Sequence, residues 1–246
     1  MSAILPTRTQ AERADQTRSR ILDAAVREFS ENGLAGARTE QIAEAAGVNK
    51  ALLYYYFQGK EALYEAALES VAERVMASSM AAMTGDRTAG EQVIRFALNH
   101  FDRIHSQQAF QSLMQQEMMR LHRGEENALT HIIEKVFRPG MMRLRDLFVE
   151  GKRSGELIQA DEWQIMYAAL GANVFYFLSA PMVGIMLERN PLERGAMEFR
   201  RKAAIEFLGL AIFIDRKHGA EVATRVLAAT PMPASSEFNI FERKVK

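Results

Sequence analysis

Helical periodicity is the feature that most constrains the fold of this chain. In almost every segment, apolar residues recur at the spacing of one helix face, whereas the strict alternation typical of a half-buried strand is almost nowhere found. Residues 17–33 give the first example. The residues that share its apolar face are Ile21, Leu22, Ala25, Val26 and Phe29. The chain is therefore predicted to be all-α.

Residues that start and stop helices divide the first part of the chain. We expect Thr17, Thr39 and Asn49 to cap three helices, because their short polar side chains accept hydrogen bonds from free backbone N–H groups. Gly33 and Gly47 follow the first two helices, where glycine tolerates the left-handed backbone conformation. Three short helices are therefore predicted in succession.

The rest of the chain is predicted to form longer helices. A fourth helix should begin near Lys60, and residues 84–90 interrupt the pattern. Further helices are predicted at roughly 90–106, 108–122, 125–153, 160–187 and 192–217. Pro139 lies within one of them and is expected to start, kink or divide a helix, because proline has no N–H to donate.

The composition narrows the class of protein. The chain has 246 residues, 48% of them hydrophobic, with 31 basic and 31 acidic side chains, so it can bury a sizeable core and does not coat nucleic acid by net charge. Its lack of cysteine excludes disulfide scaffolds, thiol catalysis and thiolate zinc sites. The first residues carry charges where an export signal needs an apolar run, so we expect a cytoplasmic protein.

The sequence gives no support to an enzyme or a metal site. It has neither a glycine-rich phosphate loop nor a serine nucleophile elbow. His100 and His105 are off the i, i+4 spacing of a helical metal site, and Glu117, His122 and His131 add no tight cluster. We therefore expect no catalytic residue, no cofactor and no metal.

The functional chemistry is concentrated in residues 39–60. Two short predicted helices joined by a tight turn at Gly47 form the helix-turn-helix pattern. The second helix of such a pair enters the major groove of DNA, where its first residues reach base edges. Leu53 and Phe57 are four residues apart and are predicted to dock this helix on the two before it.

The remaining side chains around this turn are the predicted DNA contacts. Three consecutive tyrosines on one helical turn point in different directions and cannot all be buried, which favours DNA contact over a role in the core. Lys50 is expected to read bases, and Lys60, in the first turn of the next helix, to bind a phosphate. The predicted set is Arg38, Thr39, Asn49, Lys50, Ala51, Leu52, Tyr54, Tyr55, Tyr56 and Lys60.

Residues 17–63, about a fifth of the chain, resemble the N-terminal DNA-binding domain of the TetR/AcrR transcriptional regulators. The positions that carry the resemblance are Phe29, Gly33, Thr39, Ile42, Ala43, Ala46, Gly47, Val48, Leu53, Tyr54, Tyr56, Phe57, Lys60 and Leu63. Ala51 and Leu52 depart from the family pattern, which often has a glycine and a small polar residue there.

The resemblance implies a homodimeric repressor that leaves a palindromic double-stranded operator when a small hydrophobic or amphipathic effector binds. It implies an N-terminal arm (1–16), a helix-turn-helix domain (17–63), a helical ligand-binding and dimerisation domain (64–230) and an irregular tail (231–246). Phe238, Ile240 and Phe241 are expected to pin the tail. The alternative is a DNA-bound adaptor of the same fold that recruits a protein partner without a small ligand.

The predicted effector contacts are aromatic and methionine side chains of the larger domain. Twelve of the 14 methionines lie between Met76 and Met197, which suits an adaptable apolar pocket but equally suits an irregular helical core. We expect a cavity between the helices that carry Phe101, Met114, Met118 and Tyr167. The candidate residues are Phe101, Phe110, Met114, Met118, Trp163, Tyr167 and Tyr176.

Residues 164–187 form an uncharged run long enough to span a bilayer. Asn173 and Pro181 within the run argue against a membrane span, although a membrane-anchored regulator is a further alternative. We instead expect this helix and the helix at 192–217 to form the homodimer interface, with close approach at Ala168, Ala172 and Gly209. An Ile212→Asp substitution is then expected to separate the subunits.

Overall fold

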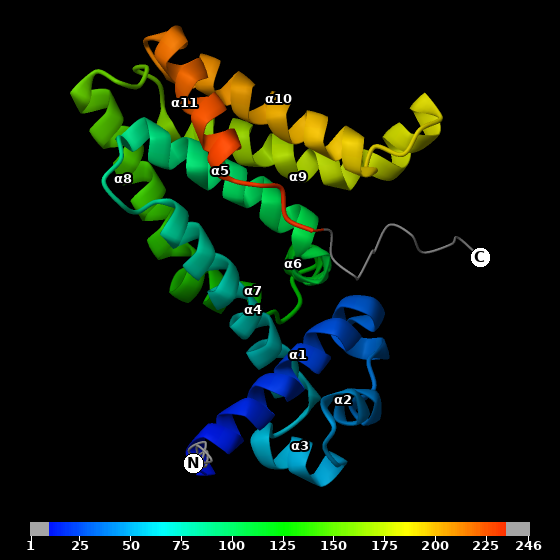
Figure 1. Ribbon diagram of the computed structural model, residues 1–246. Coiled ribbons are helices and arrows are strands. Elements are labelled where there is room, and N and C mark those ends of the chain that lie inside the picture. Colours follow the sequence, from blue (N-terminus) through cyan, green and yellow to red (C-terminus); the bar gives the residue numbers. More distant parts are fainter. Residues whose placement is uncertain (1–9, 235–246) are drawn as a thin grey trace, which may run out of the picture. The chain divides into compact units, whose positions relative to one another are not determined.

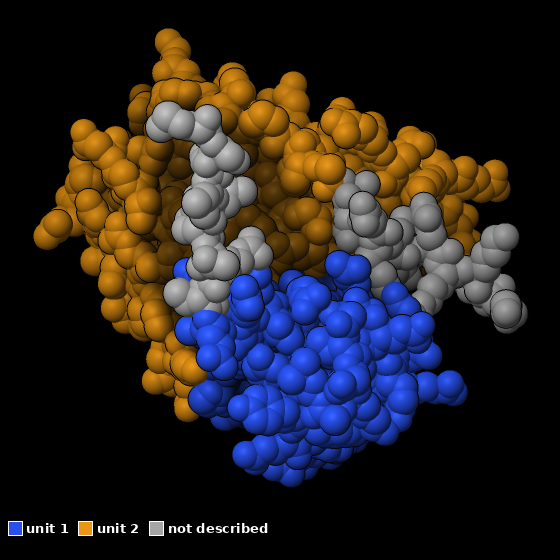
Figure 2. All heavy atoms as spheres, turned by 60° about the horizontal axis from the view of Figure 1, so that its bottom comes forward, with its two compact units in different colours: residues 1–73, 109–132 blue, residues 74–108, 133–246 orange. Residues whose placement is uncertain are grey.

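The computed structural model describes residues 10–234, and Phe238, Ile240 and Phe241 lie outside them. The described residues form two compact units, shown in different colours in Figure 2. Unit 1 comprises residues 10–73 and 109–132, and unit 2 comprises residues 74–108 and 133–234. Helix α4 contributes residues to both.

Unit 1 is made of the helices at the blue and cyan end of the chain together with a later green segment (Figure 1). Its helices are α1 (Gln10–Gly36), α2 (Thr39–Ala46), α3 (Lys50–Tyr56), the first part of α4 (Lys60–Ala82), α6 (Gln108–His122) and α7 (Leu129–Ile132). Their inward faces bury Ile21, Phe29, Ile42, Leu53, Phe57 and Leu63. Phe29 and Tyr64 pack edge to face at 5.0 Å, which joins α1 to α4.

Gly47 ends α2 as predicted, whereas Gly33 kinks α1 without ending it, and two of the predicted caps are wrong. Gly33 has a φ of 67° at a kink near the end of α1, and Gly47 has a φ of 65° at the end of α2. Helix α1 begins at Gln10, so Thr17 lies inside it and donates to the Arg13 carbonyl. Arg38 precedes α2 without a side-chain cap, because the Thr39 hydroxyl lies 3.2 Å from that of Tyr54 instead.

Unit 2 is built from the remaining helices. They are the remainder of α4, α5 (Ala89–Ser106), the π-helix η1 (Ile133–Phe137), α8 (Arg138–Ser154), α9 (Glu162–Leu187), α10 (Arg194–Ile212) and α11 (Arg216–Ala229). Pro139 lies in the first turn of α8, which agrees with the prediction that it could start a helix. Over residues 10–234 the structure contains no strand beyond an isolated bridge between Leu157 and Phe213, so the all-α prediction is confirmed.

The predicted helix at 192–217 is two helices. Phe213 is extended and bridges Leu157, and the Ile214 N–H donates to the Glu156 carbonyl at 3.1 Å. Asp215 then caps α11 by accepting from two backbone N–H groups. Leu157 lies more than 50 residues before Phe213, so the helical periodicity of residues 192–217 gave no sign of this break.

The core of unit 2 lies among α5, α8, α9, α10 and α11. Its largest members include Phe148, Ile205 and Phe213. Arg201 is also buried and forms a two-pronged ion pair with Asp102, with nitrogen–oxygen distances of 2.7 and 2.8 Å. The pair satisfies both charges, as buried ions require.

Helices α9 and α10 each carry apolar residues on two sides. Along α10 the stripe of Ile205, Leu208 and Ile212 is buried, whereas Phe207 and Leu210 are exposed. Ile212 is only 2% exposed, so the expectation that an aspartate there separates subunits is corrected: the site belongs to the core of the subunit.

Gly209 is also corrected, because it does not lie on an outer face. A Cβ there would meet the Gly219 carbonyl oxygen at 2.6 Å, so this glycine permits close packing between α10 and α11 of one chain. Helix α9 is the one helix among the described residues that is long and apolar enough to cross a membrane, and only 17% of its most apolar window is buried. Ala168 and Ala172 lie on its exposed side.

Candidate nucleic-acid interface

Helix α3 is held in place by the two residues predicted to dock it. Leu53 and Phe57 are both buried, and the guanidinium of Arg18 on α1 lies 5.5 Å from the centre of the Phe57 ring. Asn49 caps the helix by accepting a hydrogen bond from the Leu52 N–H at 2.7 Å. The helix is short, so these contacts, rather than its intrinsic propensity, keep it formed.

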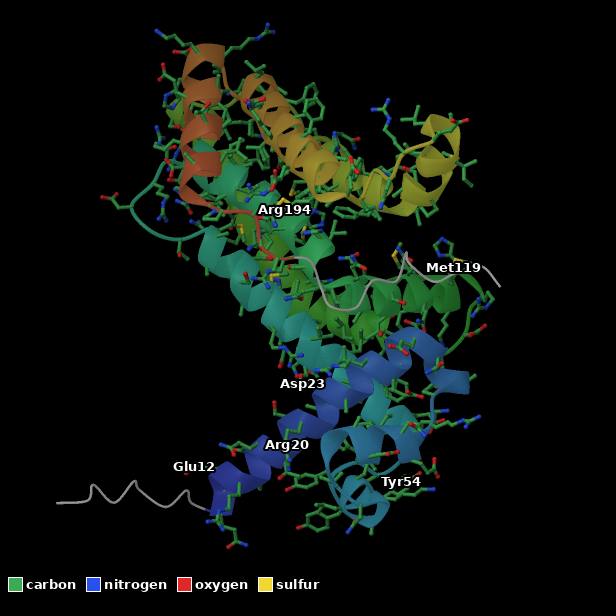
Figure 3. The ribbon with its side chains drawn as sticks, turned by 45° about the vertical axis from the view of Figure 1, so that its right-hand side comes forward. Glu12, Arg20, Asp23, Tyr54, Met119 and Arg194 are labelled. Carbon is green, nitrogen blue, oxygen red and sulfur yellow. The ribbon has the colours of Figure 1, made fainter. Side chains whose placement is uncertain are left out.

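The opposite side of α3 presents aromatic hydroxyls. Tyr55 is 82% exposed and Tyr54 is also exposed, while Tyr56 is half-buried. Tyr55 and Tyr56 pack edge to face with ring centres 5.6 Å apart, which limits the motion of both rings. Figure 3 shows Tyr54 beside α3 in unit 1. The tyrosines thus present rings and hydroxyls on the outer side of the helix, as the sequence predicted.

Lys50 begins α3 and forms an ion pair with Glu40 of α2. The hydrogen bond between them lowers the pKa of Glu40 and raises that of Lys50. The Lys50 ammonium also lies 5.8 Å from the centre of the Tyr54 ring. Glu40 was missed by sequence reasoning, although its position ten residues before Lys50 places it across the turn.

The remaining predicted DNA contacts are distributed unevenly. Ala51 and Leu52 are exposed at the start of α3, and Arg38 is exposed before α2. Thr39 is buried, and its hydroxyl lies 3.2 Å from that of Tyr54. The Lys60 ammonium donates to the Ala35 carbonyl at 3.0 Å, which fixes the start of α4 against the end of α1. Lys60 therefore has a different partner from Lys50, which pairs with Glu40.

A buried polar cluster supports α4 from within unit 1. The Glu117 carboxylate has no exposed surface and accepts from the Tyr64 hydroxyl at 2.8 Å, from Arg120 at 2.8 Å and from the Ala128 N–H at 2.7 Å. Burial and this carboxylate raise the pKa of Tyr64, which keeps the phenol protonated as a donor. The cluster joins α4 to α6 and to the segment that enters α7.

The seven predicted effector contacts are scattered. Phe101 and Tyr176 belong to one apolar cluster with ring centres 6.5 Å apart, while Trp163 and Tyr167 are exposed near the start of α9. On α6, Phe110 is buried, Met114 is half-buried and Met118 is exposed. The role of these residues in effector binding stays a prediction.

Unit 2 contains an apolar cavity of about 530 Å³ between α5, α9 and α10. None of the seven predicted residues lines it. The lining residues are Ala97, Ile158, Ile165, Ala168, Ala169, Ala172, Asn173, Arg200, Ala204, Ile205, Phe207, Leu208, Ala211 and Ile212. Sequence reasoning sought bulky side chains, whereas the small side chains of alanines leave the space open.

Comparison with known proteins finds similarity over the helix-turn-helix region. Residues 21–67 match the model of the bacterial regulatory proteins of the tetR family. The HTH-type transcriptional repressor NicS of Pseudomonas putida is 46% identical over 65 residues, covering 26% of this chain and 31% of NicS. The HTH-type transcriptional regulator RutR of Escherichia coli is 45% identical over 69 residues, covering 28% of this chain and 32% of RutR. These alignments span about a third of each relative.

Solved structures resemble a larger part of the chain. A TetR family transcription regulator from Marinobacter aquaeolei has a TM-score of 0.60 at 18% identity, covering 83% of this chain and 99% of that one. The regulator FadR from Bacillus subtilis, solved in complex with stearoyl-CoA, has a TM-score of 0.58 at 20% identity, covering 77% and 96%. At these identities the likeness concerns the fold.

Proposed function

We propose that this chain is a member of the tetR family of bacterial regulatory proteins and a DNA-binding transcriptional repressor, released from its operator by a small hydrophobic or amphipathic effector. Residues 17–63 would bind DNA, and residues 64–230 would bind the effector and form the dimer. The observation that carries the proposal is the division of α3 into a buried face and an exposed face with Lys50, Tyr54 and Tyr55.

The exposed face of α3 suits the major groove. Tyrosine hydroxyls and a lysine can donate to phosphates or base edges, and the small Ala51 leaves room for a base pair at the start of the helix. Lys50 is paired with Glu40 in the free protein, so this lysine would exchange a carboxylate for DNA on binding. Lys60 would bind a phosphate while it remains anchored to the end of α1.

A homodimer explains the apolar surface of α9 and α10. Large apolar side chains are exposed on both helices, such as Phe175 and Leu178 on α9 and Phe207 and Leu210 on α10, and a patch of this kind marks an association surface. Two copies pairing these helices in a two-fold arrangement would cover them. The dimer would also present two copies of α3 to a palindromic operator, whose half-sites lie about 34–36 Å apart.

Control by the effector would act through a shift between two dimer populations. The effector would favour a spacing of the two α3 helices that does not match the half-sites, and DNA affinity would fall. Helix α4 is the natural lever because it starts beside the helix-turn-helix and continues along the chain into unit 2. The cluster of Glu117, Tyr64 and Arg120 would hold its first part rigid.

Site selection with randomised duplex DNA tests the proposal, followed by anisotropy measurements over a range of salt concentrations. We expect a palindromic consensus and steep salt dependence. Lys60→Ala should weaken binding to all sequences alike and reduce the logarithmic salt slope by about 1, whereas Lys50→Ala should change the selected bases. A wild-type protein that selects no sequence at low salt would contradict the proposal.

A further inference from the structure

The apolar cavity of unit 2 has one polar region, formed by Arg200 and Asn173. All other lining residues are alanine, isoleucine, leucine or phenylalanine. Small-molecule sites combine a mainly apolar wall with a few orienting polar groups, and their volumes are about 300–1,000 Å³. The cavity, at about 530 Å³, has both properties.

Arg200 is unusual because it is partly buried without a carboxylate partner among residues 10–234. Its Nε is buried and has no hydrogen-bond acceptor. The adjacent Arg201 shows the opposite arrangement, since Asp102 and the Thr230 carbonyl accept its hydrogen bonds. A buried donor without an acceptor is costly, so an unfilled acceptor position beside Arg200 points to a missing group.

The guanidinium is held in position although it is not ion-paired. Its terminal nitrogen donates to the Ala172 carbonyl at 3.4 Å, and its carbon lies 5.3 Å from the centre of the Tyr176 ring. Tyr176 is itself fixed by a hydrogen bond from its hydroxyl to the Pro191 carbonyl at 2.5 Å. A positioned guanidinium loses little conformational freedom when an anion binds to it.

Asn173 adds a second polar group. Its side-chain amide nitrogen lies 3.5 Å from the Ala97 carbonyl oxygen and 3.4 Å from Nδ1 of His100. Burial lowers the pKa of His100 to about 4, so the imidazole is neutral at neutral pH and places no second positive charge beside the cavity. The charge that a ligand head group meets is therefore that of Arg200.

We propose that this cavity binds an amphipathic carboxylate, with its hydrocarbon part among the alanines and its carboxylate on Arg200. A carboxylate supplies the acceptor that Nε lacks, and its planar pair of oxygens matches the guanidinium. The inference rests on the proposed function in that this ligand would be the effector.

A second copy of the chain is the rival occupant, because Ala168, Ala172 and Phe207 also lie on the exposed face assigned to the dimer. The large apolar side chains exposed on α9 and α10, such as Phe175 and Phe207, carry no acceptor for Nε of Arg200. In our proposal the partner subunit covers the opening and the carboxylate occupies the interior.

Calorimetric titration with decanoate and with decanol tests the head group. Wild-type protein should bind decanoate, and Arg200→Gln should bind it about 10- to 100-fold more weakly, because a charged hydrogen bond is lost. Decanol should bind both proteins alike. The matched control is Arg194→Gln on the same helix, since Arg194 is exposed and paired with Glu198 outside the cavity (Figure 3). Arg200→Lys, which keeps the charge, should bind decanoate more tightly than Arg200→Gln.

Several results would overturn the inference. These are equal decanoate affinity for wild type and Arg200→Gln, equal affinity of wild type for decanoate and decanol, no decanoate binding by protein that binds DNA, or decanoate splitting the dimer. Ala204→Phe, which fills the cavity without touching the charge, should abolish binding of both probes. Loss of DNA binding by a protein that still binds decanoate would instead reject the proposed function, so the two failures are distinguishable.

Discussion

Two exposed surfaces of this molecule carry large side chains, and their chemistry differs. The surface of α3 in unit 1 combines tyrosines with Lys50, so every large group except Leu52 has a polar end. The surface of α9 and α10 in unit 2 is formed mainly by side chains without polar atoms, such as Phe175, Leu178 and Phe207. A charged and hydrated partner such as DNA suits the first surface. An apolar protein surface suits the second.

The difference also shows how each helix is anchored. Helix α3 has seven residues and depends on two buried side chains and a cap, whereas α10 has nineteen residues and buries a continuous stripe. Substitutions on α10 can therefore be divided into those that unfold unit 2 and those that affect only association. On α3 the exposed residues can be changed with little effect on folding.

The largest expected effect separates the two sides of α10. Ile212→Asp should destabilise unit 2 by more than about 4 kcal/mol, because it places a carboxylate in the core without a partner. The control is Leu210→Asp, the same substitution two residues earlier on the exposed side. Urea unfolding should show a collapse of stability for the first variant and little change within the subunit for the second. Equal losses would show that the two sides are not distinct.

The next effect concerns association. Leu178→Asp on α9 should convert a dimer into monomers, because two-fold symmetry would bury the new charge in the interface. Operator affinity should fall with it, since each monomer carries a single α3. Mass measurements at micromolar concentration, with a fold check by circular dichroism, would establish both. A folded monomer that binds the full operator at wild-type affinity would show that operator binding does not depend on the dimer.

The sequence predicted the elements well, because most of them are specified locally. Gly47 ends α2 and Gly33 kinks α1, both with a positive φ that glycine tolerates, and Leu53 and Phe57 bury the face of α3 that their spacing indicated. The buried stripe of α10 also follows helical spacing, since Ile205, Leu208 and Ile212 are three and four residues apart. In each case the neighbours that matter are within one or two helical turns.

Features that depend on distant partners could not be predicted. The break after Ile212 is stabilised by backbone hydrogen bonds to residues 156–158. Thr39 does not cap a helix, and its hydroxyl instead contacts that of Tyr54. Gly209 was assigned to the wrong surface because spacing does not show which neighbour a glycine faces. The cavity was not predicted either. It forms where small alanine side chains leave space between helices, and such a space corresponds to no sequence motif.

A smaller effect compares two tyrosines of unit 1. Tyr64→Phe should lower stability by about 1–2 kcal/mol, because the buried Glu117 carboxylate loses a donor. Tyr55→Phe should leave stability unchanged, because its hydroxyl is in solvent, but should reduce DNA affinity several-fold if that hydroxyl donates to a phosphate. Thermal unfolding and anisotropy together separate the two results. Unchanged DNA affinity for Tyr55→Phe would remove this hydroxyl from the interface.

The smallest effect concerns the ion pair between Lys50 and Glu40. Both side chains are exposed, so Glu40→Gln should leave the unfolding midpoint unchanged. It should nevertheless strengthen DNA binding a few-fold at low salt, because Lys50 no longer has to leave a carboxylate and a negative charge is removed from beside the phosphates. Gln41→Glu, which adds a charge next to the same position on α2, is the opposite control and should weaken binding. Anisotropy at several salt concentrations measures both, and the difference between the variants should shrink as salt rises, since screening reduces the interaction of exposed charges. If neither substitution changes affinity at low salt, Lys50 lies away from the DNA, and the polar surface of α3 would have to be assigned to Tyr54 and Tyr55 alone.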